Sequence, residues 1–368
     1  MKNITVQEVT TRRQRRQFVE FPKKLYADNP YYVPDMDNDI YDLLPRLTAY
    51  LAYDEKGQVV GRVTAFINQK ANDRWQRRAV RFSHIDFIDD PDVCRALLEA
   101  VEAYGRAHQM DEAMGPLGFF DFDKEGLLTE GFDRMSSIIE YYNAPYYAPY
   151  LEQAGYEKEA EWVQTHFAIP KEVPPVFKRV SEFVRRKSGY HVVKLTNKQI
   201  AKEGYGRRIF DLLNDAYKNL FGFSEMPPEQ VDSYINQYLK LIDKEIIPVI
   251  MDREGNIVGA AITMGSLSHA TRKSNGRYLP FGWWHLLRSL YWKREDTVNL
   301  LLIAVKPELQ GHGVNALFFE DLVPIYNRMG FKWAETGPQL EDNMKELSQW
   351  EPLNPTFSKR RRCYGKKL

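Results

Sequence analysis

The sequence predicts an α/β protein built from two tandem copies of one fold. Three observations support this prediction: the chain has 368 residues, one hairpin pattern occurs in both halves, and an apolar strand leads through a glycine-rich loop into a helix. A chain of this length exceeds what a single hydrophobic core usually serves. We therefore expect two domains, each combining strands with helices.

The repeated hairpin is the clearest internal symmetry. Residues 53–67 read YDEKGQVVGRVTAFI, and residues 251–265 read MDREGNIVGAAITMG. Each segment places an Asp, a turn glycine and a second glycine ahead of an apolar strand. A fainter echo links DEAMGP at 111–116 with WAETGP at 333–338, and residues 266–292 form a candidate insertion in the second half. Duplication explains both echoes, and a common hairpin pattern is the alternative.

The join between the copies is expected near residues 169–180, where three prolines disfavour regular structure. We expect a first domain over residues 1–170, a linker over 171–189 and a second domain over 190–368. Periodicity and capping signals predict the individual elements. Helices are expected at 11–27, 91–109, 197–220 with Asn197 as a cap, 227–243, from the glycine loop to 328 and from 341, and strands at 48–53, 59–67, 80–88, 111–115, 190–196, 246–251, 257–264, 297–305, 331–336 and 356–365.

The strand and loop at 298–315 carry the strongest functional signal. The apolar run VNLLLIAV is followed by KPELQGHGVN and then by a helical pattern. A helix N-terminus presents unpaired amides and the positive end of the helix dipole, and glycines let the backbone approach an anion closely. This order of elements predicts a phosphate-binding loop, with a purely structural turn as the alternative. The expected loop comprises Gln310, Gly311, His312, Gly313, Val314 and Asn315.

This loop resembles the acyl-coenzyme A pyrophosphate loop of the GCN5-related N-acetyltransferase (GNAT) family. The family pattern is Arg or Gln, two residues, Gly, any residue, then Gly or Ala, and Asn315 departs from it at the last position. The later segments FKWAET, LEDNMKEL and KRRRCYGKKL also resemble the family, and LPFGWWHLLR resembles a bacterial two-domain subgroup of uncharacterised GNAT-like proteins. The resemblance implies two tandem GNAT-like domains, each a mixed, mostly antiparallel sheet flanked by helices.

The resemblance also implies a reaction, the transfer of an acetyl or other acyl group from acyl-coenzyme A to an amine. A main-chain amide of the strand before the loop meets the acyl carbonyl in the family, so Ala304 and Val305 are the expected donors. The amine must lose a proton and the thiolate must leave, which makes Glu335 a candidate base and Tyr364 a candidate acid. A solvated strand-end charge is the alternative for Glu335. Asn343 lies where the family contacts the coenzyme.

The first half lacks a comparable loop. Its strand-to-helix junction contains Asp89, Asp90 and Asp92, which would repel a pyrophosphate. Asp90 or Asp89, followed by Pro91, instead predicts a helix cap. We therefore expect the first domain to be a degenerate copy that binds no coenzyme. The aromatic stretch at 119–156 either shapes the acceptor site or packs as a structural loop.

Composition narrows the other functions. A net charge of +1 gives no indication of nucleic-acid binding, and the two cysteines cannot form a disulfide framework, which favours a reducing, cytoplasmic location. The seven histidines are scattered without a metal-binding pattern, so no metal is expected. Residues 279–294 form an amphipathic segment that suits a lipid surface, its own protein or a second subunit in a homodimer.

The acceptor is expected to be a small-molecule or peptide amine. Two alternatives to this reading stay open. One is an aminoacyl or long-chain acyl transferase that resembles the peptidoglycan-building Fem enzymes on the same tandem fold. The other is a coenzyme-A-binding or interaction protein without catalysis, since the late helix has no Tyr and Asn315 departs from the family pattern.

Overall fold

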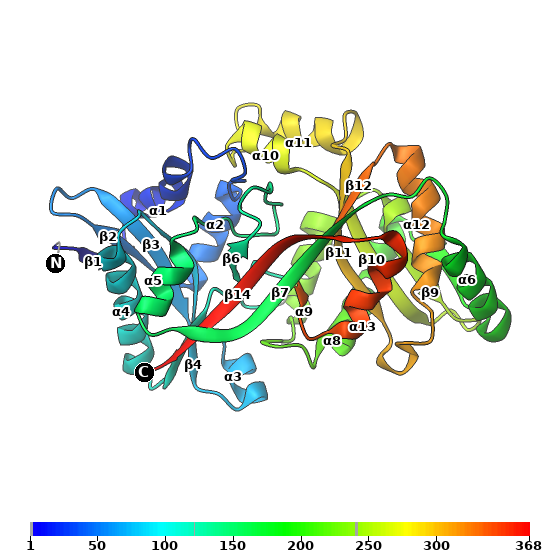
Figure 1. Ribbon diagram of the computed structural model, residues 1–368, viewed down its shortest axis with the longest axis horizontal. Helices are drawn as coiled ribbons and strands as arrows, with labels where there is room; N and C mark the ends of the chain where they lie inside the picture. Colours follow the sequence, from blue (N-terminus) through cyan, green and yellow to red (C-terminus); the bar gives the residue numbers. More distant parts are fainter. Residues whose placement is uncertain (1–2, 121, 240–241) are drawn as a thin grey trace. The chain divides into compact units, whose positions relative to one another are not determined.

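The computed structural model describes residues 3–120, 122–239 and 242–368, and the chain packs as two compact units. Unit 1 comprises Met1–Val163, Leu267–Leu287 and Lys359–Leu368, and unit 2 comprises Gln164–Ser266 and Arg288–Ser358. Both units combine a mixed sheet with flanking helices (Figure 1). The predicted α/β class is therefore confirmed. The expected domain boundaries stay a prediction, because the two packing units alternate along the chain.

Unit 1 contains a sheet in the order β1-β2-β3-β4-β5-β14-β7, with β6 beside β14 and with residues 157–163 of β7 in this unit. From β1 to β14, its neighbouring strands are antiparallel except β4 and β5, which run parallel from Ala79 opposite Glu112 to Arg81 opposite Met114. Helix α4 packs on β3 and β4 (Figure 1). The elements are β1 (Thr5–Glu8), α1 (Arg12–Leu25), α2 (Asp37–Leu43), η1 (Leu44–Arg46), β2 (Thr48–Tyr53), β3 (Val59–Phe66), α3 (Gln69–Trp75), β4 (Ala79–Phe87), α4 (Pro91–Ala107), β5 (Glu112–Gly115), β6 (Leu127–Glu130), α5 (Tyr147–Gln153), α10 (Ser268–Ser274), the first part of α11 (Gly282–Tyr291) and β14 (Thr356–Lys367) from Lys359 onward.

Unit 2 contains a sheet in the order β7-β12-β11-β10-β9-β8, with β13 beside β7. Strands β11 and β12 run parallel, whereas β10 is antiparallel to both β9 and β11. Helix α12 packs on α6 (Figure 1). The elements are β7 (Glu157–Ala168) from Gln164 onward, α6 (Pro175–Ser188), β8 (His191–Lys194), α7 (Asn197–Lys202), α8 (Tyr205–Tyr217), α9 (Pro228–Tyr234), η2 (Ile235–Leu239), η3 (Lys244–Ile246), β9 (Pro248–Met251), β10 (Ile257–Gly265), β11 (Thr297–Val305), η4 (Pro307–Leu309), α12 (Ala316–Met329), β12 (Trp333–Thr336), β13 (Gln339–Leu340), α13 (Met344–Leu347) and η5 (Ser348–Leu353).

The repeated hairpin has the same local structure in both units. The Oδ1 atom of Asp54 accepts from the amides of Lys56 and Gln58, and that of Asp252 accepts from the amides two and four residues later. Both turn glycines have positive φ, 72° at Gly57 and 80° at Gly255. The conserved geometry supports duplication of one hairpin.

The second glycine of each hairpin allows a helix to pack closely on the sheet. A Cβ atom at Gly61 would lie 2.8 Å from Leu97 Cδ1 of α4, and one at Gly259 would lie 3.1 Å from Phe318 Cζ of α12. Both contacts are tighter than a side chain tolerates without movement of its neighbour. The two units therefore share the same helix-on-sheet contact at equivalent positions.

Three local predictions are wrong. Residues 175–188, expected within a linker, form helix α6, because Pro175 occupies the first turn, where proline is tolerated. Thr196, and not Asn197, is the N-cap of α7, since its side chain accepts from the Gln199 amide in a capping box. The helix expected over 197–220 breaks at Gly204, which has a φ of 82°.

Candidate functional site

The centre of unit 2 contains a strand edge that its parallel neighbour leaves open. Strand β11 pairs with β12 from Thr297 opposite Trp333 to Leu300 opposite Thr336. Strand β11 continues to Val305, while the chain after Thr336 turns away, and the Gly337 amide donates to Leu300 O at 2.9 Å. Residues 300–303 are only half-buried although they lie on a central strand. The second part of β11 therefore borders an opening in the sheet.

A tyrosine hydroxyl occupies this open edge. Tyr217, the last residue of α8, donates to Ile303 O at 3.0 Å and accepts from Ile303 N at 3.2 Å. Because backbone directions alternate along a strand, Val305 directs its N–H and C=O to the same side as Ile303. Val305 O accepts from Gln310 Nε2 at 3.3 Å, which agrees with this direction. Ala304 is opposite Ala260 of β10, so its backbone groups face the neighbouring strand.

The glycine loop follows this strand directly. The turn η4 leads into Gly311 and Gly313, which both have a φ of 79°, and α12 begins at Ala316. His312 N is used within the loop, since it donates to Leu309 O at 3.3 Å. Among the residues that the structure describes, none accepts a hydrogen bond from the remaining loop amides. These open amides belong to Gly311, Gly313, Val314 and Asn315.

The two loop glycines have different surroundings. A Cβ atom at Gly311 would meet nothing within 4 Å, whereas one at Gly313 would lie 2.5 Å from Val180 Cγ1 of α6. Gly313 is therefore required for packing as well as for its positive φ. Asn315 stands where the family pattern has Gly or Ala, and its Nδ2 donates to Gln349 Oε1 of η5 at 3.2 Å. This contact holds the side chain, while the main-chain amide of Asn315 forms no hydrogen bond.

The corresponding edge of unit 1 is filled by side chains from α5. Strand β4 continues to Phe87 beyond its parallel pairing with β5, which ends at Arg81. Phe87 N donates to Tyr147 Oη at 2.8 Å, and Phe87 O accepts from Tyr146 Oη at 2.7 Å. The rings of Phe87 and Tyr147 stack with centroids 4.0 Å apart, and every residue of β4 is buried. This edge therefore offers no open backbone groups at Phe87.

A buried ionic cluster lies beside this filled edge. Arg62 Nε donates to Asp86 Oδ2 at 2.7 Å, and Arg62 also approaches Asp35. Burial raises the pKa of Asp35, but the charges of Lys124, His84 and Arg62 outweigh it and hold that pKa at about 2. Burial lowers the pKa of His84 to about 3, so His84 is neutral at pH 7. Its Nδ1 lies 2.9 Å from Ser83 Oγ.

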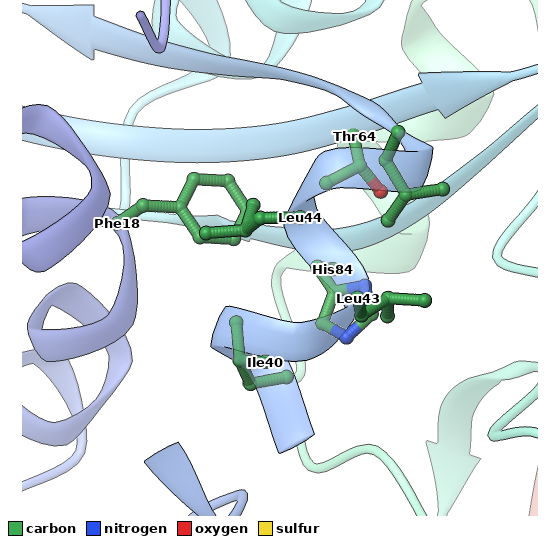
Figure 2. Close-up of a pocket in the computed structure, with 7 residues that line it drawn as sticks. Phe18, Ile40, Leu43, Leu44, Thr64 and His84 are labelled. Atoms are coloured by element: carbon green, nitrogen blue, oxygen red, sulfur yellow. The ribbon is translucent and has the colours of Figure 1, made fainter. Parts of the chain in front are cut away.

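Figure 2 shows a small recess next to His84. It has no room for a water molecule, and apolar side chains dominate its lining. Pockets for drug-sized ligands measure roughly 300–1,000 Å³, so this recess is too small for a coenzyme. The lining residues are Phe18, Ile40, Leu43, Leu44, Leu47, Thr64 and His84.

Comparison with known proteins identifies the fold. No protein-family model matches the chain. A tandem GNAT protein from the clavulanic acid biosynthesis pathway superposes with a TM-score of 0.58 at 12% identity, over 99% of this chain and 98% of that chain. The chain has the tandem GNAT fold. The predicted resemblance to the family is confirmed at the level of the fold.

Two curated proteins are similar to this tandem GNAT chain over nearly its whole length. Protein YghO of Escherichia coli K12 is 26% identical over 95% of this chain and 92% of that protein. Bacterial ceramide synthase of Caulobacter vibrioides is 25% identical over 100% of this chain and 98% of that protein. The similarity therefore includes both GNAT-like halves.

The other predicted site residues of the GNAT fold lie in different surroundings. Glu335 lies on β12, and its Oε1 accepts from Ser358 Oγ at 2.7 Å. Asn343 precedes α13 and donates from Nδ2 to Glu346 Oε2 at 2.9 Å. Tyr364 lies in the core of unit 1, where its hydroxyl donates to Glu152 Oε1 at 3.0 Å and its pKa is about 12, raised by burial. The assigned roles of these residues stay predictions.

Two residues of unit 2 were missed by sequence reasoning. Tyr217 ends a helix whose pattern does not indicate contact with β11. Glu346 accepts from Gln339 Nε2 at 2.8 Å as well as from Asn343, and burial raises its pKa although the Gln339 hydrogen bond opposes this. The motif at 340–347 drew attention to Asn343, and the carboxylate three residues later is the signal that would have found Glu346.

No group of three or more His, Cys, Asp or Glu side chains is arranged to hold a metal ion in the part of the chain that the structure describes. In the same residues, none of the helices has the length and apolar character needed to cross a bilayer.

Proposed function

We propose that unit 2 binds acyl-coenzyme A and that the protein transfers the acyl group to an amine. One observation carries this proposal: the open edge of β11 runs directly into a loop with four open amides. The loop amides and the dipole of α12 suit a pyrophosphate. The edge of β11 suits an extended chain with amide groups, because such a chain pairs with a free strand edge.

The proposed roles follow from the direction of each group. The amides of Gly311, Gly313, Val314 and Asn315 would hold the pyrophosphate. The N–H of Ile303 or Val305 would donate to the acyl carbonyl oxygen and stabilise the negative charge that develops there. The coenzyme supplies the thioester as the activated acyl donor. The Tyr217 hydroxyl hydrogen-bonds both the N–H and the C=O of Ile303. It therefore marks a position where a hydrogen-bonding group of the ligand would fit.

The attacking amine must also lose its proton. Glu335 remains the proposed base, and Glu346 is a second carboxylate in unit 2 whose raised pKa suits proton transfer closer to neutral pH. Separate Glu335→Gln and Glu346→Gln variants assign the role. The base is the residue whose variant lowers kcat about 100-fold or more while acyl-coenzyme A affinity is retained. Unchanged kcat in both variants contradicts a carboxylate base at these positions.

The acceptor is proposed from the curated relatives. The similarity to a bacterial ceramide synthase extends over the whole chain, and that name denotes N-acylation of a long-chain amine. We propose an amphiphilic amine with a long-chain acyl donor as the preferred pair, and a small soluble amine with acetyl-coenzyme A as the second candidate. Thiol release with each donor and a panel of short and long-chain amines separates the two. Activity with aminoacyl-tRNA alone supports the Fem-like alternative instead.

A matched pair of variants tests coenzyme binding at the loop. Gly311 has open space and positive φ, and both Asp and Asn tolerate this backbone region. Gly311→Asp adds a charge beside the expected pyrophosphate, whereas Gly311→Asn adds the same shape without it. We expect calorimetric titration with acetyl- and long-chain acyl-coenzyme A to show affinity about tenfold weaker for Gly311→Asp than for Gly311→Asn.

Two results would contradict the proposal. Equal affinities in the two variants would show that the pyrophosphate lies elsewhere. If the wild type binds neither acetyl-, nor long-chain acyl-, nor free coenzyme A, the proposal that unit 2 binds a coenzyme is wrong.

A further inference from the structure

The connection between β10 and β11 carries several large apolar side chains that are exposed. We define the aromatic insertion as residues 278–293, which include the end of a loop, helix α11 and the residues that follow it. Leu279 is 75% exposed, Phe281 68% and Trp292 67%. Other large side chains of the insertion are also exposed: Tyr278, Trp283, Trp284 and Tyr291. Large apolar side chains exposed together in one segment are typical of an interaction site.

The base of the insertion is anchored, so the exposed side chains are held in place. Ser268 Oγ donates to Ser136 O at 2.8 Å, and the Gly276 carbonyl accepts from Asp37 N at 2.8 Å. Arg277 pairs with both carboxylate oxygens of Glu20 at 2.7 and 2.8 Å. All of these contacts lie within unit 1. Residues 278–287 of the insertion follow directly after this anchor in unit 1, and residues 288–293 belong to unit 2.

The charged side chains within residues 267–294 are all basic, and the acidic Glu20 and Asp39 lie near the start of the insertion. Residues 267–294 contain no Asp or Glu, but they contain six Lys and Arg residues. Arg272, Arg277 and Arg294 are engaged by protein groups. The side chains of Lys273, Arg288 and Lys293 are exposed. A surface with Trp, Tyr and Phe beside exposed cations matches the interfacial zone of an anionic bilayer, where aromatic rings lie at headgroup depth.

We propose that the aromatic insertion docks the protein on an anionic membrane surface. The apolar side chains at 279, 281, 284 and 292 enter the headgroup region, and Lys273, Arg288 and Lys293 contact lipid phosphates. A second copy of the chain is a weaker match, because a twofold contact would bring these cations against one another. Residues 294–296 connect the insertion to β11, so docking places a lipid surface close in sequence to the strand with the open edge.

Vesicle co-sedimentation of the full chain tests this proposal. We expect binding to vesicles of phosphatidylcholine mixed with phosphatidylglycerol, and weaker binding at high salt because the charges are then screened. The double variant Leu279→Ser/Phe281→Ser should lower the partition coefficient about tenfold or more, since two exposed apolar side chains are removed from the bilayer. The matched control, Val176→Ser/Phe183→Ser, changes exposed apolar residues on α6 and should bind as wild type.

A second pair of variants tests the charge contribution. Lys273→Glu/Lys293→Glu should weaken binding to the anionic vesicles, whereas Lys56→Glu/Lys70→Glu, which changes exposed lysines elsewhere in unit 1, should weaken it much less. Absence of wild-type binding overturns the proposal, as does equal binding by the Ser variants and wild type. A concentration-dependent dimer that Leu279→Ser/Phe281→Ser abolishes, without vesicle binding, would assign the surface to a second copy. The assay contains no coenzyme, so it succeeds or fails independently of acyl transfer.

Discussion

Strands β4 and β11 occupy the same position in the two units but differ in what covers their free edge. In unit 1, Phe87 is bonded by Tyr146 and Tyr147, and all of β4 is buried. In unit 2, a single hydroxyl from Tyr217 bonds Ile303, and residues 300–303 are half-buried. The two units share the same arrangement of strands and helices. Of the two compared edges, that of β11 is accessible and that of β4 is not.

The segments that follow β4 and β11 differ in the same way, since protein groups fill the one in unit 1 and not the one in unit 2. In unit 1, Asp90 caps α4 through the Asp92 amide at 3.0 Å, which confirms the predicted cap, and Asp89 accepts from Tyr150 Oη. In unit 2, four amides before α12 have no acceptor among the described residues. A carboxylate occupies the helix N-terminus in unit 1, whereas unit 2 leaves that place for an external anion. This contrast supports the proposal that the coenzyme binds to unit 2 and not to unit 1.

The largest expected effect concerns the ionic cluster of unit 1. Arg62→Met leaves the buried carboxylates of Asp86 and Asp35 without their guanidinium partner, and we expect the free energy of unfolding to fall by about 4 kcal/mol. Denaturant titration measures this loss. Arg95→Met is the control, since its ion pair with Asp92 is exposed and such pairs contribute about 0–1 kcal/mol. Equal losses in the two variants would contradict a structural role for the cluster.

Tyr147→Phe tests the filled edge itself. The variant leaves Phe87 N without an acceptor in a buried position and removes the contact with Tyr26 Oη at 2.7 Å. We expect a loss of about 3 kcal/mol in unfolding free energy. Tyr150→Phe on the same helix removes an exposed hydroxyl contact and should cost far less. A stability equal to wild type for Tyr147→Phe would show that the edge is not held by this hydroxyl.

His84 gives unit 1 a dependence on pH. Its folded pKa of about 3 lies below the usual 6.5, so the unfolded chain binds more protons between these values and stability falls as pH falls. Asp35 opposes this shift, whereas Arg62 and Lys124 favour it. Between pH 7 and pH 5 the expected loss is about 2 kcal/mol, and His84→Asn should remove it while tolerating the φ of 47°. The control is His108→Asn, which changes an exposed histidine. If the stability of His84→Asn depends on pH as that of the wild type does, His84 is not the source of this dependence.

Tyr217→Phe should have the smallest effect on stability of the four variants, and it should strengthen the binding of acyl-coenzyme A. The variant frees Ile303 N and O without burying them fully, so stability should fall by only about 1 kcal/mol. Acyl-coenzyme A no longer competes with the hydroxyl, and its affinity should rise about fivefold in calorimetric titration. Tyr205→Phe on the same helix serves as control. Weaker binding by Tyr217→Phe would instead make the hydroxyl part of the ligand site.

Sequence reasoning found the elements that depend on local signals. Strands β2 and β11 begin and end at the predicted residues, and the hairpins around Gly57 and Gly255 match because turn chemistry is encoded within a few residues. The loop at 310–315 was also predicted, since its glycines lie between an apolar strand and a helix. The prolines near 174 were misleading, because proline both interrupts a helix and favours its first turn.

The rest of the site depends on contacts between distant residues. The Tyr217 hydroxyl meets Ile303 across 86 positions, and no periodicity encodes such a contact. Tyr364 packs in the core of unit 1, because β14 pairs with β5 at this position, and its role as an acid stays a prediction. The sequence pattern of each half is the same whether its last strand pairs within that half or with the other half. The pattern therefore cannot predict this exchange of a strand.

The pairing of β14 with β5 has a consequence for synthesis on the ribosome. Residues 364–367 pair with residues 112–115, so this part of the sheet is completed by a segment that is translated long after it. Until that segment emerges, the edge of β5 is available to other nascent chains, a situation that favours misassembly. The sheet of unit 1 is therefore completed only when the last residues of the chain have been synthesised.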